Sequence, residues 1–305
     1  MPKASAQSSI EKQGKRLLRL AEKIPRFRSS RLAEALIKAI RYGNSDLAVW
    51  FLKHGADVRA KDGKGRSALW WAATFCQPVL VREFVRRGVE LPDDVLMGPV
   101  AGAQTDLVRF LIKHGANVNC VARKYTGSGH LHLKEHILTA ALRTIAVHPE
   151  AESIPVMLIR AGADVNQLIA QTWFMSATGF SMLGMAAHIG LLNTVRAMIA
   201  AGADVNLRDK QGRTALFNAL EQGHLRVAAE LLRAGARTNV IDDAGMTPLE
   251  TVQHQERSPD MDGTEWLIST GVKVDQRKQE AERRAWQALR ARMISLLERQ
   301  TNIRK

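Results

Sequence analysis

Glycine recurs along this chain at an interval close to a fixed period. Gly55 and Gly88 are 33 positions apart, as are Gly202 and Gly235, and the intervals between the glycines at 55, 88, 115, 162, 202, 235 and 271 run from 27 to 47. A period of this length is one supersecondary unit, and such a unit leaves apolar surface that only a neighbouring copy covers. The spacing therefore predicts a stack of about seven repeats rather than a single globular core.

The segment between Gly202 and Gly235 predicts two helices and a turn. Thr214 precedes an apolar run and is placed to accept a hydrogen bond from a backbone N–H in the first helical turn. Gly223 and Gly235 are expected to end the two helices, because glycine adopts positive φ at little cost. The segment is thus read as one helix-turn-helix unit.

Three short patterns make this unit similar to the ankyrin repeat. They are a Thr-Pro-Leu helix start, complete at 247–249, a central Gly-His at 223–224, and a terminal Gly-Ala-Asp at 202–204. The resemblance implies an all-α ankyrin-repeat solenoid, in which stacked helix-turn-helix units carry β-turn fingers along one edge and helical caps at the ends. It also implies a concave surface that binds other macromolecules.

Irregular intervals predict where the repeats depart from the regular length. The repeat between Gly88 and Gly115 is expected to lack its finger, and Pro99 inside its first helix is expected to add strain or a kink. The long intervals place insertions at 121–134 and 171–177, both on the finger edge.

Positive charge is concentrated at the two ends of the chain. Of the net charge of +14, residues 1–31 contribute nine Lys or Arg against two Glu, and residues 273–305 ten against four acidic residues, which leaves +1 for the middle (14 − 7 − 6). We expect residues 1–10 to be disordered, 11–30 to form a basic N-terminal helix or cap, 31–275 to form the repeat domain, and 276–305 to form a basic C-terminal capping helix. The alternative for both ends is weak contact with nucleic acid or an anionic membrane surface.

Nothing in the sequence assembles an active site. His130, His132 and His136 bind a metal only if further ligands are added, and the adjacent Gly-Ser-Gly predicts a loop. Gly63-Lys64-Gly65 matches neither a P-loop nor a dinucleotide motif. We therefore expect no catalytic residue, cofactor or metal; a metalloenzyme formed by the histidine insertion is the remaining enzymatic alternative.

Cysteine usage and hydropathy indicate the compartment. Cys76 and Cys120 lie in different repeats without partner spacing, so neither a disulfide framework nor a zinc site is expected. Neither an apolar run of about eighteen residues nor a signal pattern is found. A soluble intracellular protein, cytoplasmic and monomeric, is expected, and delivery into another cell stays open.

Residues at finger tips and at the ends of first helices are expected to line the concave groove. Arginine and aromatic side chains are the usual anchors of protein interfaces. The groove positions are Arg41, Tyr42, Lys64, Arg66, Thr74, Phe75, Arg143, His188, Ile189, Lys210, Gln211, Arg213, Glu221, Gln222 and Met246. The sequence thus favours a non-enzymatic scaffold or adaptor that binds another protein; the alternative is an adaptor that also tethers to nucleic acid or membrane through its basic ends.

The insertion at 171–177 is the predicted centre of recognition. Trp173, Phe174 and Met175 are either an anchor for the partner or a cover for the groove floor, since clusters of exposed apolar side chains are uncommon. The predicted partner-binding set is Tyr42, Lys64, Arg66, Phe75, Arg143, Trp173, Phe174, Met175, Phe180, Ile189 and Arg213.

Overall fold

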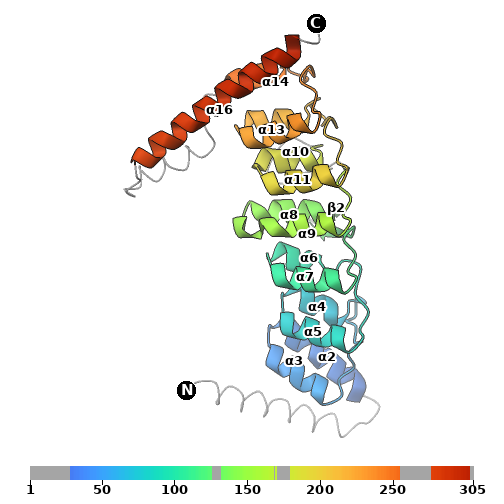
Figure 1. Cartoon of the computed structure of the whole chain (residues 1–305). Coiled ribbons are helices and arrows are strands. Elements are labelled where there is room, and N and C mark those ends of the chain that lie inside the picture. Colours follow the sequence, from blue (N-terminus) through green and yellow to red (C-terminus); the bar gives the residue numbers. More distant parts are fainter. Residues whose placement is uncertain (1–27, 126–131, 168, 170–178, 255–275, 303–305) are drawn as a thin grey trace. The chain divides into compact units, whose positions relative to one another are not determined.

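A computed structural model describes residues 28–125, 132–167, 169, 179–254 and 276–302 (Figure 1). The chain divides into two compact units, Met1–Thr144 and Ile145–Lys305, and each is described by itself. Helices in pairs dominate both units, as the all-α prediction required. Of the predicted N-terminal helix or cap at 11–30, residues 11–27 lie outside the described residues, as does the insertion 171–177, and residues 28–30 belong to the first helix of the first unit.

The first unit is built from helix pairs. They are α2 (Arg28–Arg41) with α3 (Ser45–Lys53), α4 (Ala68–Thr74) with α5 (Pro78–Arg86), and α6 (Met97–Ala101) with α7 (Thr105–Lys113). The first helices pack in a row, α2 on α4 and α4 on α6, and α3 packs on α5 behind them. Fully buried side chains such as Leu36, Leu69 and Phe84 fill the space between the rows. Each pair therefore depends on its neighbours for burial.

A hairpin and a further helix follow in the first unit. Strands β1 (Val121–Tyr125) and β2 (His132–His136) pair antiparallel, with Val121 opposite His136. Helix α8 (Ile137–Ile145) begins directly after β2. His132 and His136 thus belong to a strand and not to an early start of the helix. Four residues of strand separate the two backbones by about 13 Å. A metal site formed by these two histidines was expected only if they lay one turn apart on the same face of a helix.

The second unit repeats the paired arrangement. It contains η2 (Pro149–Glu152), α9 (Ser153–Arg160), α10 (Met182–Ile189), α11 (Leu192–Ala200), α12 (Ala215–Glu221), α13 (Leu225–Arg233), α14 (Pro248–His254) and α16 (Gln276–Asn302). Helices α10, α12 and α14 form one row, α9, α11 and α13 the other, and α16 packs on α13 and α14. Buried Phe217, Leu220 and Leu231 lie in the core between these rows.

Local signals explain most helix ends. Ser67 and Ser181 accept hydrogen bonds from the N–H groups of Trp70 and Gly184, at 3.0 and 2.9 Å, and so cap α4 and α10. Gly223 and Gly235 have φ of +70° and +91°, as expected from their places after α12 and α13.

The cap expected at Thr214 does not form. Thr214 precedes α12, but its hydroxyl makes no capping bond and is buried without a partner among the described residues. Packing of the buried face of α12 is sufficient to fix the helix start, because tertiary burial contributes more to a short helix than its cap does.

Proline 99 produces no kink. Helix α6 begins only two residues earlier, so Pro99 lies in the first turn, where a backbone N–H has no helical acceptor to lose. The tight constraint is instead at Gly98, where a Cβ atom would lie 2.5 Å from the Cα atom of Thr74. The close approach of α6 to α4 therefore requires glycine at this position.

Asparagine side chains join consecutive repeats of the second unit. The amide of Asn166 accepts from the N–H of Asp204 at 2.8 Å and donates to the carbonyl of Gly202 at 3.2 Å. Asn206 makes the same pair of bonds one repeat later, with Arg237 at 2.8 Å and Gly235 at 3.3 Å. We call these contacts the asparagine bridges.

Candidate protein-binding surface

A rigid turn at Asp62 forms the finger of the second repeat. The Oδ1 atom of Asp62 accepts hydrogen bonds from the backbone N–H groups of Lys64 and Arg66, at 2.8 and 2.9 Å. Its Oδ2 atom accepts from Nε of Arg66 at 2.9 Å and from the indole N–H of Trp71 at 3.1 Å. Burial alone raises the pKa of Asp62, but these donors outweigh it and lower the pKa to about 2. The carboxylate is therefore ionised and fixed at neutral pH.

Two guanidinium groups contact the indole ring of Trp71. The Cζ atoms of Arg66 and Arg41 lie 4.2 and 4.8 Å from the centre of the ring. Phe75, one helical turn later, stacks on Trp71 with ring centres 5.6 Å apart and an interplanar angle of 9°. Cation–π and stacking contacts thus order Arg41 and Phe75 from α2 and α4. We call Arg41, Tyr42, Arg66, Trp71 and Phe75 the Arg–Trp surface.

Two aromatic side chains of this surface are accessible. Tyr42 is 86% exposed and Phe75 is 46% exposed, and each directly follows the first helix of its repeat. Lys64 at the finger tip is also exposed. Aromatic and arginine side chains that are ordered and still accessible to solvent are the residue types that anchor protein partners.

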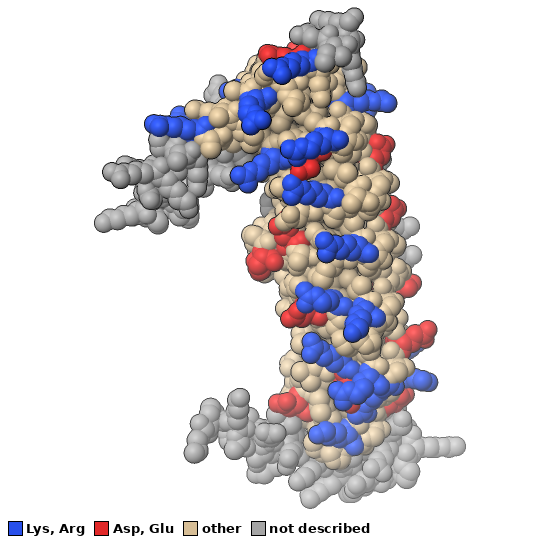
Figure 2. Space-filling model, viewed as in Figure 1, with Lys and Arg blue, Asp and Glu red and all other residues tan. Residues whose placement is uncertain are grey.

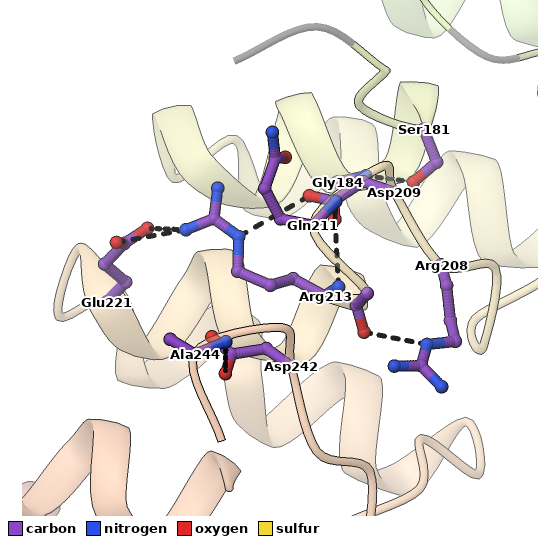
Figure 3. A network of polar contacts seen from close by, with 10 residues as sticks. Ser181, Gly184, Arg208, Asp209, Gln211, Arg213, Glu221, Asp242 and Ala244 are labelled. Carbon is purple, nitrogen blue, oxygen red and sulfur yellow. Dashed lines mark hydrogen bonds and ion pairs between the residues drawn. The ribbon is translucent and has the colours of Figure 1, made fainter. Parts of the chain in front are cut away.

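The corresponding finger of the second unit has a different electrostatic arrangement (Figure 3). Asp209 makes the same turn by accepting from the N–H groups of Gln211 and Arg213, both at 2.9 Å. The Nη1 atom of Arg213 contacts both carboxylate oxygens of Glu221, at 3.0 and 3.1 Å, and its Nε lies 3.6 Å from Oδ2 of Asp209. Two acidic residues of the chain itself therefore surround this guanidinium, whose side chain is only 16% exposed.

An aromatic and a histidine lie behind Arg213. The Phe180 ring centre is 5.8 Å from the Arg213 Cζ atom and 5.8 Å from the imidazole of His188. Burial, with the nearby His224 and Arg213, lowers the pKa of His188 to about 4. His188 is therefore neutral at physiological pH.

The structure corrects one member of the predicted partner-binding set. Phe180 is only 2% exposed, because it packs between Arg213 and His188, so its ring offers no contact area. Ile189 is partly buried. Arg143 is engaged by Glu135 at 2.9 and 3.2 Å. Trp173, Phe174 and Met175 lie outside the described residues.

The residue that organises the Arg–Trp surface was missed by the sequence analysis. Trp71 lies at the centre of the contacts but is only 7% exposed, so it orders its neighbours rather than presenting itself. Trp71 precedes Phe75 by four residues, and residues at this spacing share one face of a helix. This spacing is the sequence signal that could have identified Trp71.

The outer helices carry basic side chains in their last turns. Lys53, Arg86 and Lys113 occupy these positions in α3, α5 and α7 of the first unit, and Figure 2 shows Lys and Arg side chains at the surface with Asp and Glu among them. Positive charge at a helix C-terminus complements the helix dipole. Glu83 also pairs with Arg86 and Arg87. This face is explained by helix stability and local ion pairs.

Paired helices stacked in two rows, with aspartate-turn fingers between repeats, define a solenoid of the repeat class. A family model for ankyrin repeats matches the chain over residues 36–122, 145–242 and 183–278. The chain belongs to the ankyrin-repeat family, which confirms the resemblance seen in its glycine and Thr-Pro-Leu patterns.

Several characterised proteins share parts of this sequence. The chain is 28% identical over 274 residues to human ankyrin repeat and SOCS box protein 16, covering 76% of the chain and 56% of that protein. It is 33% identical over 153 residues to the chicken nuclear factor NF-kappa-B p105 subunit, covering 48% of the chain and 13% of that protein. It is 42% identical over 72 residues to the ADP-ribosylation factor GTPase-activating protein AGD4 of Arabidopsis thaliana, covering 24% of the chain and 9% of that protein. The chain thus spans little more than half of these relatives at most.

A solved structure is also similar. The ankyrin repeat domain of Bcl-3 matches with a TM-score of 0.49 at 21% identity, covering 74% of the chain and 96% of that domain. Of the helices that the structure describes, none has the length and apolar character needed to cross a membrane.

Proposed function

We propose that this chain is a non-enzymatic scaffold that binds another protein, and that the Arg–Trp surface is one of its contact sites. Ankyrin repeats generally mediate protein–protein interaction, and this family membership supports the general role. The observation that supports the site is the combination of order and exposure, since Tyr42 and Phe75 keep accessible area while Trp71 and two arginines hold the surface in place.

Preorganisation is the physical reason for choosing this surface. A side chain that is ordered before binding loses less conformational entropy when the partner arrives. Phe75 is already stacked on Trp71, and Arg41 and Arg66 are already placed beside the indole ring. Burial of Phe75 by a partner would therefore contribute to affinity with little ordering cost.

The C-terminal helix supports a capping role for residues 276–305. Arg290 of α16 donates to the carbonyl oxygens of Val252 and Gln253, at 3.1 and 2.8 Å, and Leu297 is fully buried. A helix that uses its arginine and leucine on its neighbours covers the apolar end of a repeat stack. We therefore favour the cap over a nucleic-acid or membrane tether for this end of the chain.

Site-specific photo-crosslinking tests the proposed contact. A photoreactive phenylalanine analogue at position 75 is expected to crosslink a protein partner in the native cell extract. The same analogue at Val79, which is 64% exposed on α5, is the matched control. Equal crosslinking to the same species from both positions would show that Phe75 has no special role. The double variant Tyr42→Ser with Phe75→Ser should lose the partner while the chain stays folded, as circular dichroism checks, because neither side chain lies in the core.

A further inference from the structure

The fingers of the two units allow a direct internal comparison. Asp62, Arg66 and Thr74 correspond to Asp209, Arg213 and Glu221, each 147 positions later. The helices that follow, α4 and α12, are both seven residues long and stand in the same register. Differences between the fingers therefore reflect their side chains and not a different backbone plan.

The turn itself does not require basic side chains. Asp242 makes the same turn a third time, accepting from the N–H groups of Ala244 and Met246 at 3.0 and 2.8 Å. Ala244 and Met246 stand there in place of Lys64 and Arg66. The turn therefore forms without basic residues, and its fold does not explain why the finger at Asp62 carries positive charge.

The two arginines differ in their acidic partners. Arg213 is surrounded by Asp209 and by Glu221 at the end of α12. Arg66 pairs with Asp62 at 2.9 Å, and among the described residues it has no second carboxylate, because Thr74 stands where Glu221 stands in the other unit. The side chain of Arg66 is accordingly 33% exposed against 16% for Arg213.

Further cations accompany Arg66, on the same indole ring and in the same finger segment. Arg41 lies on the same indole ring as Arg66 and has no carboxylate partner among the residues that the structure describes. The finger segment 59–66 holds Arg59, Lys61, Lys64 and Arg66 against the single Asp62. The exposed ring of Phe75 stacks on the same Trp71 ring that Arg41 and Arg66 contact, and the exposed Tyr42 directly follows Arg41 in the chain. An acidic group next to a large apolar side chain is complementary to such a surface.

We infer that the Arg–Trp surface binds an acidic polypeptide segment, one of whose carboxylates takes the place beside Arg66 that Glu221 takes beside Arg213. An aromatic or large aliphatic residue of the same segment packs on Phe75. This inference rests on the proposed function and names the chemistry of the partner. The recognition is a charge-assisted hydrogen bond to a guanidinium that is already in position.

The substitution Thr74→Glu tests the inference, because it supplies the carboxylate from within the chain. The probe is a fluorescein-labelled peptide that repeats Glu-Glu-Phe-Gly, and its affinity for the full chain is measured by fluorescence anisotropy. Thr74→Glu should weaken binding by about tenfold or more, as expected for loss of one charge-assisted contact. Thr74→Gln, which is the same size and neutral, should stay within about twofold of the unmodified chain. Circular dichroism melts confirm that both variants are folded.

Two further probes separate the partner classes. The peptide with Gln in place of Glu should bind at least about tenfold more weakly than the acidic peptide. Equal affinity of Thr74→Glu and Thr74→Gln for the acidic peptide would overturn the inference, as would preferential binding of oligothymidylate, which would point to a phosphate polymer. If Thr74→Glu is unfolded, the variant Arg66→Gln replaces it and should lower the affinity for the acidic peptide to the same extent.

The proposed function and the inference fail in different ways. A partner that crosslinks to position 75 but binds Thr74→Glu and Thr74→Gln equally would leave the scaffold role standing and refute the acidic segment. Absence of any specific crosslink from position 75, with the peptide still sensitive to Thr74→Glu, would place the acidic contact outside the proposed partner site.

Discussion

Arg290 of α16 donates a hydrogen bond from Nη2 to the backbone carbonyl oxygen of Gln253, 2.8 Å away in α14. The last carbonyl groups of a helix have no backbone N–H donor within that helix, so a side chain from elsewhere can donate to them. The long basic helix at the C-terminal end is thereby joined to α14 by hydrogen bonds from its arginine, and Leu297 of the same helix is buried.

Leu297→Ala is expected to destabilise the protein if α16 is a cap. Leu297 is fully buried, and truncation of a buried leucine to alanine costs about 2–5 kcal/mol of unfolding free energy. Leu296→Ala is the matched control, since Leu296 is 43% exposed and should change stability by less than about 0.5 kcal/mol. Urea unfolding of the full chain measures both. Equal stability of the two variants would contradict the cap.

Gly98→Ala is expected to destabilise the first unit. A Cβ atom at this position would lie 2.5 Å from the Cα atom of Thr74 and 2.7 Å from the carbonyl oxygen of Ala73, so backbone must move. Overpacking of this kind costs about 1–3 kcal/mol. Gly63→Ala adds the same methyl group at a place with no atom within 4 Å and should be close to neutral. Thermal melts of the two variants side by side provide the measurement.

Acid is expected to loosen the finger at Asp62. The pKa of this carboxyl is lowered from 3.8 to about 2, so its contribution to stability is complete above pH 3.8 and is lost as the pH falls toward 2. Asp62→Asn removes the titrating group and should abolish this component of the acid dependence, while losing the ion pair with Arg66 at every pH. Melting temperatures between pH 5 and pH 2 report the difference. Parallel curves for the two proteins would show that Asp62 is not the group responsible.

The lowered pKa of His188 predicts a second pH range, above that of Asp62, in which the stability of the protein changes. Burial, His224 and Arg213 lower the pKa of His188 from 6.5 to about 4, so the unfolded chain takes up this proton as the pH falls below 6.5 and the folded chain does not. The second unit should therefore lose stability between pH 6.5 and pH 4. His188→Gln carries no proton in this range and should flatten the dependence. Direct titration of the His188 ring by nuclear magnetic resonance checks the pKa itself.

Periodic glycine predicted the fold well because each of these glycines from 55 to 235 has a positive φ. Gly223 and Gly235 have the positive φ that was expected of them, and the Thr-Pro-Leu pattern at 247–249 led to the correct family. Backbone signals of this kind are local, so the sequence alone reveals them.

Side-chain surroundings were harder to predict, because they depend on neighbouring repeats. Phe180 was expected to contact a partner and is instead covered by Arg213 and His188, which lie 33 and eight positions later in the sequence. Leu296 and Leu297 are neighbours in the last helix, where successive residues point about 100° apart. Only Leu297 faces the core, while Leu296 stays 43% exposed.

The asparagine bridges have a mechanical consequence. Asn166 and Asn206 each hold the start of the following repeat, whereas Arg59 and Pro92, at the same motif position after Gly55 and Gly88, have no side-chain amide to do so. Because each repeat contacts only its neighbours, a pulling force separates the most weakly joined repeats first. When the chain is pulled from its two ends, we expect the repeats that close at Gly55 and Gly88 to detach one by one at low force, and the repeats joined by Asn166 and Asn206 to release together in a larger step.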